Sequence, residues 1–137
     1  MKSIKVGFST KLSFDISGKH NFLTRLSQAM QKMGVTIDNK RPDFYIFLPG
    51  DKIKKECINV LRLNGLIIDE KIDYISKNNK IVESINKSDA IVYQNEFCQL
   101  AYQNFLEINK TPYACILNGA DPNDFLPRNP KKYILTN

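Results

Sequence analysis

The sequence has few of the residues that metal sites and disulfides need. It contains one histidine and three cysteines, Cys57, Cys98 and Cys115, in 137 residues. The cysteines stand singly at apolar positions, without metal-ligand spacing, and their odd number leaves one unpaired in any disulfide scheme. They predict buried free thiols in a reducing compartment. The single histidine argues against a His/Cys metal site, so no metal is expected.

Long apolar runs and phosphate-loop motifs are lacking as well. No stretch reaches the roughly 18 apolar residues of a transmembrane helix, so no membrane span is expected. The N-terminus runs straight into an expected strand, unlike a secretory leader, and the expected location is cytoplasmic. The loop before the first expected helix carries neither G-x-x-x-x-G-K-S/T nor G-x-G-x-x-G, so it matches neither common nucleotide-binding motif.

What remains is the composition of a soluble globular domain, with 42% hydrophobic and 25% charged residues. The net charge is +6, which fits a nucleic acid, an anionic membrane surface or a phosphorylated ligand as partner. The aromatic residues fall mostly on apolar faces rather than among lysines on one sheet face, as stacking platforms for bases require. A nucleic acid is therefore not expected as a partner, whereas association with a membrane surface stays open.

Apolar periodicity predicts strands that alternate with helices. Strands are expected at 3–8, 35–37, 44–48, 58–63, 89–93 and 112–117, and helices at 19–33, 78–86 and 95–108. A helix between two strands is a βαβ unit with parallel strands. The link between 44–48 and 58–63 is too short for a useful helix, so this crossover is abbreviated. The pattern predicts an α/β domain with a mainly parallel sheet.

Each helix shows an apolar stripe that is expected to face the sheet. The expected inward residues are Phe22, Leu26, Ala29, Met30 and Met33 in the first helix, Ile81, Val82 and Ile85 in the second, and Phe97, Leu100, Ala101, Phe105 and Ile108 in the third. Gly34 is expected to end the first helix as a C-terminal cap.

Four loops leave the carboxyl ends of the expected strands, where open α/β sheets bind their ligands. They span 9–19, 49–52, 64–65 and 94–97. The candidate ligand-facing residues in and beside them are Ser17, Gly18, Lys19, Arg62, Asn64, Gly65, Gln94, Asn95 and Glu96. The first three precede or open a helix, whose N-terminus favours an anion.

A structural alternative accompanies these candidates. The first loop also fits an ordinary turn with a capping serine, and His20 fits a surface or capping residue better than a catalytic base. Arg62 is also able to pair with Asp69 or Glu70 instead of a ligand. Glu96 fits the first turn of a helix, where a carboxylate is favourable.

A stiff exit segment closes the domain. Asn118-Gly119 is a turn signal, and Asp121-Pro122 is able to start a helical turn. Asn118, Gly119 and Asp121 are the expected interdomain hinge. Residues 1–126 are expected to form one domain, and residues 127–137 a linker and the start of a second.

Three segments resemble GT-B glycosyltransferases, in particular the retaining sugar-nucleotide enzymes of family four. ILNGADPNDFLP is similar to their I-x-N-G-V-D-x-x-x-F-x-P signature, with Ala120 in place of Val. VLRLNG resembles V-x-R-x-D-G, with Asn64 in place of the acid, and SDAIVYQNEF resembles A-D-x-V-I-x-Q-S-E-F. Gly18 matches a family glycine, while Lys19 stands where a second glycine often lies.

The resemblance implies a Rossmann-like three-layer domain, the acceptor-side half of such an enzyme. The complete enzyme would transfer a sugar from a nucleotide-sugar donor, its substrate, to a sugar or glycoconjugate acceptor, with no cofactor and no metal. The partner would be a C-terminal nucleotide-binding domain that carries paired glutamates, and this half alone would be inactive. A non-catalytic flavodoxin-like or Rossmann-like binding module is the alternative from the sequence.

Overall fold

The computed structural model describes residues 3–12, 18–69, 71–108 and 112–119. Within them three helices alternate with six strands, in the order β1 Lys5–Phe8, α1 Gly18–Lys32, β2 Thr36–Ile37, β3 Phe44–Phe47, β4 Ile58–Leu63, α2 Tyr74–Lys87, β5 Ala90–Tyr93, α3 Glu96–Leu106 and β6 Tyr113–Cys115. The abbreviated crossover is confirmed, because β3 and β4 are joined without a helix.

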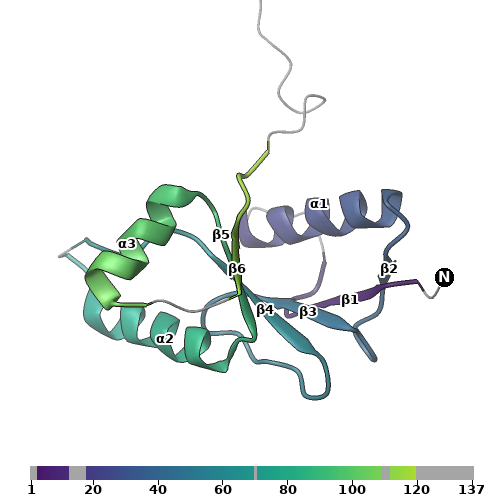
Figure 1. Cartoon of the computed structure of the whole chain (residues 1–137), viewed down its shortest axis with the longest axis horizontal. Coiled ribbons are helices and arrows are strands. Elements are labelled where there is room, and N and C mark those ends of the chain that lie inside the picture. The colour runs from purple at the N-terminus through teal and green to yellow at the C-terminus, as the bar shows by residue number, and fades with distance from the viewer. Residues whose placement is uncertain (1–2, 13–17, 70, 109–111, 120–137) are drawn as a thin grey trace, which may run out of the picture.

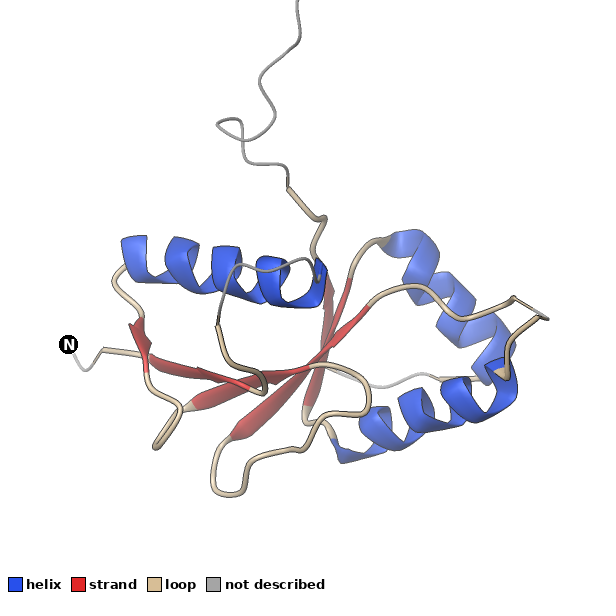
Figure 2. Ribbon diagram, turned by 180° about the vertical axis from the view of Figure 1, so that it is seen from behind, coloured by secondary structure: helices blue, strands red, loops and turns tan. Residues whose placement is uncertain are grey.

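All strand pairs are parallel, and the sheet order is β2-β1-β3-β4-β5-β6. The chain moves from β1 outward to β2, then returns to β3 and continues in the opposite direction to β6. Helix α1 therefore lies on one face of the sheet, and α2 and α3 lie on the other (Figures 1 and 2). The predicted α/β, Rossmann-like three-layer fold is confirmed.

Two apolar cores lie on the two sides of this sheet. The core beneath α2 and α3 consists of Phe47, Leu61, Leu63, Ile81, Ile85, Ile91, Tyr93 and Tyr102. The core beneath α1 consists of Val6, Phe8, Leu23, Ile46 and Leu48, with half-buried residues around it. Alternation along β4 separates them, because Leu61 and Leu63 enter the first core while Val60 packs against the second.

Several element boundaries differ from the sequence prediction. Helix α2 begins at Tyr74, four residues before the expected start, because the Asp73 side chain accepts a hydrogen bond from the Ser76 N–H at 3.0 Å and caps it. The last strand shrinks from 112–117 to Tyr113–Cys115. Gly34 has a φ of +85°, as its capping role requires.

The predicted face of α3 was wrong at three of its residues, while the predicted Ile108, just past the helix, does pack against the core. Phe97 and Phe105 are each 78% exposed and Leu100 is also exposed, whereas Cys98 and Tyr102 are buried. Helix α3 is apolar on more than one side, so its periodicity fits two different buried faces and does not choose between them. Contact with the sheet selects the second stripe, through the Tyr102 ring, whose centroid lies 5.8 Å from that of Tyr93.

Two smaller expectations about burial were also wrong. Ala29 on α1 and Met33 just after it are exposed, and the fully buried residue of this helix is Leu23, which lay outside the expected stripe. Of the three free cysteines only Cys98 is buried, while Cys57 is half-buried and Cys115 lies exposed on edge strand β6.

Candidate functional site

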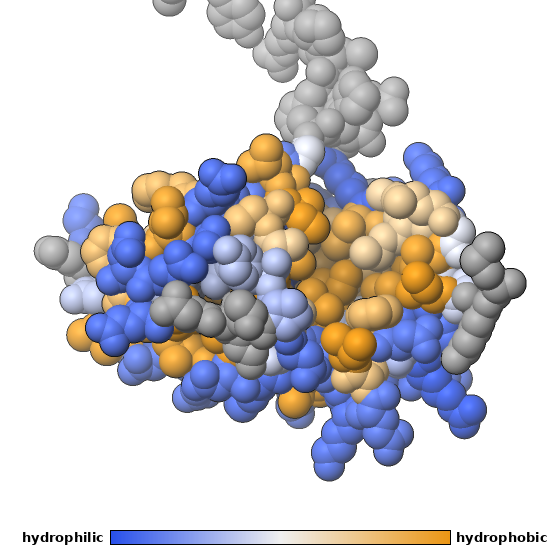
Figure 3. Space-filling view, viewed as in Figure 1, coloured by the Kyte–Doolittle hydropathy of each residue, from blue (hydrophilic) through white to orange (hydrophobic). Residues whose placement is uncertain are grey.

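A groove of about 670 Å³ runs between α1 and the segment that follows β6. We call it the α1 groove. Its lining consists of Gly18, Asn21, Phe22, Arg25, Leu26, Ala29, Met30, Ile46, Val60, Arg62, Val92, Ile116, Leu117, Asn118 and Gly119. Figure 3 shows apolar side chains gathered in the hollow between α1 and the end of β6. Its volume lies within the range of small-molecule sites.

The sheet supplies the floor of the α1 groove. Strand register pairs Ile46 with Val60 and Arg62 with Val92, so these four residues form neighbouring pairs across β3, β4 and β5. Alternation turns them away from the core beneath α2 and α3. Helix α1 lies over the half of this face nearest β1 (Figure 1), and the α1 groove runs beside it, over Arg62 of β4 and Val92 of β5.

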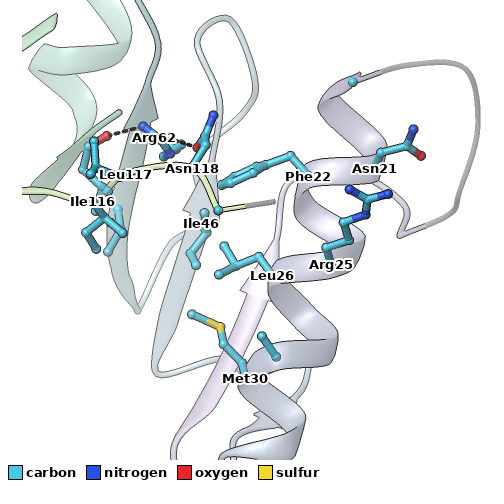
Figure 4. A pocket seen from close by; sticks show the side chains of 15 residues that line it. Asn21, Phe22, Arg25, Leu26, Met30, Ile46, Arg62, Ile116, Leu117 and Asn118 are labelled. Carbon is cyan, nitrogen blue, oxygen red and sulfur yellow. Dashed lines mark hydrogen bonds between the residues drawn. The ribbon is translucent and has the colours of Figure 1, made fainter. Parts of the chain in front are cut away.

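Arg62 is the one charged residue on this floor, and its side chain is 4% exposed. Its Nη1 donates hydrogen bonds to the carbonyl oxygens of Leu63, at 2.7 Å, and Val92, at 3.4 Å. Its Nη2 donates to the Asn118 side-chain oxygen at 2.5 Å (Figure 4). The guanidinium carbon lies 5.2 Å from the centre of the Phe22 ring, a cation–π contact.

No carboxylate among the described residues pairs with Arg62. The predicted alternative partner Asp69 instead accepts a hydrogen bond from the Lys71 N–H, so that pairing was wrong, and Glu70 lies outside the described residues. Burial lowers the pKa of Arg62 from its usual value. Burying a cation without an opposite charge is costly, because neutral carbonyl and amide oxygens offset only part of the lost hydration.

The α1 groove changes character along its length. The first two turns of α1 contribute Asn21, Phe22 and Arg25. Of these three side chains, Phe22 reaches toward Arg62 and Asn118, whereas Asn21 and Arg25 point away from them (Figure 4). The later turns of α1 contribute Leu26, Ala29 and Met30, and the Leu26 and Met30 side chains point toward the side on which Ile46 lies (Figure 4). One end is therefore cationic and able to hydrogen-bond, and the other is apolar.

A second hollow of about 450 Å³ lies at the carboxyl ends of β3 and β4. Its lining is Pro49, Gly50, Asn64, Gly65, Ile67, Lys77, Lys80 and Ile81. The Gly50 N–H donates a hydrogen bond to the Ser84 hydroxyl at 3.0 Å, which ties this turn to α2. Asn64 and Gly65, two of the predicted site residues, belong here rather than to the α1 groove.

The predicted site residues thus divide between two hollows and a helix end. Gly18, Arg62, Asn118 and Gly119 line the α1 groove. Lys19 is the second residue of α1, while Ser17 and Asp121 lie outside the described residues.

Gln94, Asn95 and Glu96 line neither hollow. Asn95 caps α3 by accepting a hydrogen bond from the Cys98 N–H at 2.8 Å. Glu96 lies in the first turn of that helix, which is the structural role predicted as the alternative to ligand binding.

Sequence reasoning missed a polar cluster between the ends of β1 and β3. The Ser9 hydroxyl donates to the Asp51 carboxylate at 2.5 Å, and the Thr10 hydroxyl shares a hydrogen bond of 2.9 Å with His20 Nε2. His20 therefore ties the β1–α1 loop to the helix. Adjacent loops were predicted to converge at this edge, but no spacing in the sequence paired these particular side chains.

Comparisons with protein-family models, with curated proteins and with solved structures returned no match. The family resemblance therefore depends on the sequence motifs alone. None of the described helices is both long and apolar enough to cross a membrane. In the same part of the chain, no three His, Cys, Asp or Glu side chains gather closely enough to hold a metal ion.

Proposed function

We propose that this chain is the acceptor-side half of a GT-B glycosyltransferase, which transfers a sugar from a nucleotide-sugar donor. In this proposal a second, nucleotide-binding domain completes the reactive cleft. The α1 groove and the hollow at Asn64 and Gly65 would form this half's share of that cleft. They lie toward the carboxyl ends of the strands, where open α/β sheets place their ligands.

One observation carries the proposal. Two of the segments that resemble the family, VLRLNG and ILNG, are far apart in the sequence but meet in space. Arg62 from the first donates a hydrogen bond to Asn118 from the second, at 2.5 Å. Residues of both segments line one groove. A shared binding role requires such a meeting, whereas independent structural roles would not require it.

The third segment contributes structure rather than chemistry. The Asp89 carboxylate accepts a hydrogen bond from the Asn59 N–H at 2.7 Å, at the start of β4, and Asn95 caps α3. The described residues offer no nucleophile–base pair at the α1 groove, which fits a half that binds and orients an acceptor. Stabilisation of the departing diphosphate would then fall to cationic side chains and helix dipoles of the second domain.

Titration with nucleotide sugars tests the proposal. Calorimetry on the 137-residue chain should give dissociation constants weaker than about 1 mM, outside the range usual for enzyme substrates. Micromolar binding of a nucleotide sugar by this chain alone would contradict it. The reading frame beyond Asn137 provides a second test, since the proposal requires a following α/β domain with a pair of glutamates.

The strand order favours a second candidate function, a flavodoxin-like binding module. The first five strands follow the order 2-1-3-4-5, as in flavodoxins, whose FMN binds at the switch point between the neighbouring strands β1 and β3. Ser9 and Thr10 follow β1 at that point. A yellow preparation, or quenching of FMN fluorescence on addition of the protein, would support this module against the glycosyltransferase half.

A further inference from the structure

Arg62 brings a positive charge to the floor of the α1 groove, and none of the described carboxylates pairs with it. It is 4% exposed, and its described partners are neutral oxygens of Leu63, Val92 and Asn118. A bound anion would supply the missing charge at a site already shielded from water. Such a pairing is stronger there than at an exposed surface.

The guanidinium also retains hydrogen-bonding capacity. It carries five N–H groups, and the three hydrogen bonds to Leu63, Val92 and Asn118 use three of them. Carboxylates and phosphates accept two parallel N–H groups from one arginine.

The rest of the groove suits hydrocarbon. Leu26, Ala29 and Met30 form one wall, and Ile46 and Val60 form the floor below them. These residues carry no side-chain group that is able to hydrogen-bond a sugar. An occupant that matches both ends has an anionic head and an apolar chain.

We infer that the α1 groove binds an amphiphilic anion, with a carboxylate or phosphate on Arg62 and its hydrocarbon chain along Leu26, Met30 and Ile46. That this anion is also the class of acceptor for sugar transfer rests on the proposed function; that the groove binds it does not. Ligand binding to the groove itself is measurable without any transfer reaction.

Calorimetric titration of the 137-residue chain provides the test, with all ligands below their micelle concentrations. Decanoate and decyl phosphate distinguish the two anionic heads, decyl glucoside removes the charge, and inorganic phosphate removes the chain. The expected order places at least one anionic decyl ligand about tenfold or more ahead of both controls, because charge-assisted hydrogen bonds are the stronger ones.

Variants locate the binding. Arg62→Met should abolish the preference for the anionic ligand over decyl glucoside, and Arg62→Lys should keep part of it. Ala29→Phe fills the apolar end from an exposed position and should weaken every decyl ligand about tenfold or more. Gln28→Phe is the matched control, since residue 28 is exposed on the same helix but does not line the groove, and its affinities should equal those of the wild type.

The inference is overturned if decyl glucoside binds as well as the anions, or if Ala29→Phe and Gln28→Phe behave alike. Absence of binding together with a dimer that Ala29→Phe dissociates would assign the groove to a second copy instead, and would also overturn it. Binding of the anions without transfer by any completed enzyme would remove the proposed function and leave this inference intact. Sugar transfer by the completed enzyme to uncharged acceptors alone would support the proposed function and overturn this inference.

Discussion

The two faces of the sheet are built from the same strands, but one face forms a closed core and the other lines a groove. Beneath α2 and α3, Leu61, Leu63 and Tyr102 are each 0% exposed in a closed core. On the α1 side, Val60 and Arg62, the alternate residues of the same β4 strand, line a groove of about 670 Å³. A face covered by two helices provides stability, and a face covered by one keeps a surface on which a ligand is able to bind.

The largest expected effect contrasts two adjacent residues of β4. Leu61→Ala should lower the free energy of unfolding by about 2–5 kcal/mol, because a buried leucine leaves a cavity that relaxes only partly. Val60→Ala should cost under about 1.5 kcal/mol, because the side chain already borders open space. Urea denaturation of both variants provides the measurement, and equal losses would contradict the contrast between the faces.

The cap of α3 offers the next effect. Asn95→Ala removes the hydrogen bond from the Cys98 N–H to the side chain and should cost about 1 kcal/mol of stability. Asn95 lines neither hollow, so ligand affinity at the α1 groove should not change. Urea denaturation measures the stability of this variant, and calorimetric titration of the same preparation measures its ligand affinity. A tenfold loss of affinity at unchanged stability would move Asn95 from the structural face to the binding site.

Tyr102 tests whether the closed core is optimal. Its hydroxyl is buried without a hydrogen-bond partner among the described residues, and burial raises its pKa above the usual tyrosine value. Tyr102→Phe removes this unpaired group and should leave stability unchanged or raise it by up to about 1 kcal/mol. Thermal and urea unfolding measure it. A clear loss of stability would show that the hydroxyl has a partner, such as a buried water.

The smallest effect concerns acid and the β1–β2 edge beside α1. The Arg41 and Lys40 N–H groups donate to Asp38, and Lys5 pairs with it at 3.2 Å, which lowers its pKa from 3.8 to about 2. A lowered pKa in the folded state stabilises above the unfolded value, and this contribution is lost as pH falls from about 4 to 2.

Carboxyl NMR titration should therefore place Asp38 near 2, and Asp38→Asn should remove the local pH dependence of amide exchange at Lys40 and Arg41. A titration midpoint at or above 3.8 would contradict this assignment. The closed core beneath α2 and α3 should show no change in the same range, since Leu61, Ile91 and their neighbours carry no charge.

Much of the fold was predictable from local pattern. Helices placed between apolar strands predicted a parallel sheet, and Gly34 and Asn95 lie at helix ends, where such residues are favoured. Boundaries set by a single side chain were less accessible, as Asp73 shows at the start of α2. The face of α3 was mistaken because Phe97, Leu100 and Phe105 form as good an apolar stripe as the one that the sheet buries.

The candidate site was predictable only in part. The turn signal at 64–65 indicated the carboxyl edge of the sheet, and Arg62 was identified beside it, whereas Asn118 and Gly119, which line the α1 groove, were predicted only as a hinge. The contact between Arg62 and Asn118 joins residues that β5 and α3 separate in the sequence, and no local pattern encodes such a meeting. The contribution of Phe22, Leu26 and Met30 was also hidden, because a groove wall and a core stripe have the same periodicity.

The sequence by itself determined that this protein is a parallel α/β domain, since alternating apolar runs and amphipathic helices have few other ways to bury their faces. It also determined that Arg62 and Leu61 point to opposite sides of the sheet. The tertiary structure alone decided which side stays open. The chain reverses its direction across the sheet between β2 and β3, so α1 lies on one face and α2 and α3 lie on the other, and the α1 groove is the space that this arrangement leaves over β4 and β5.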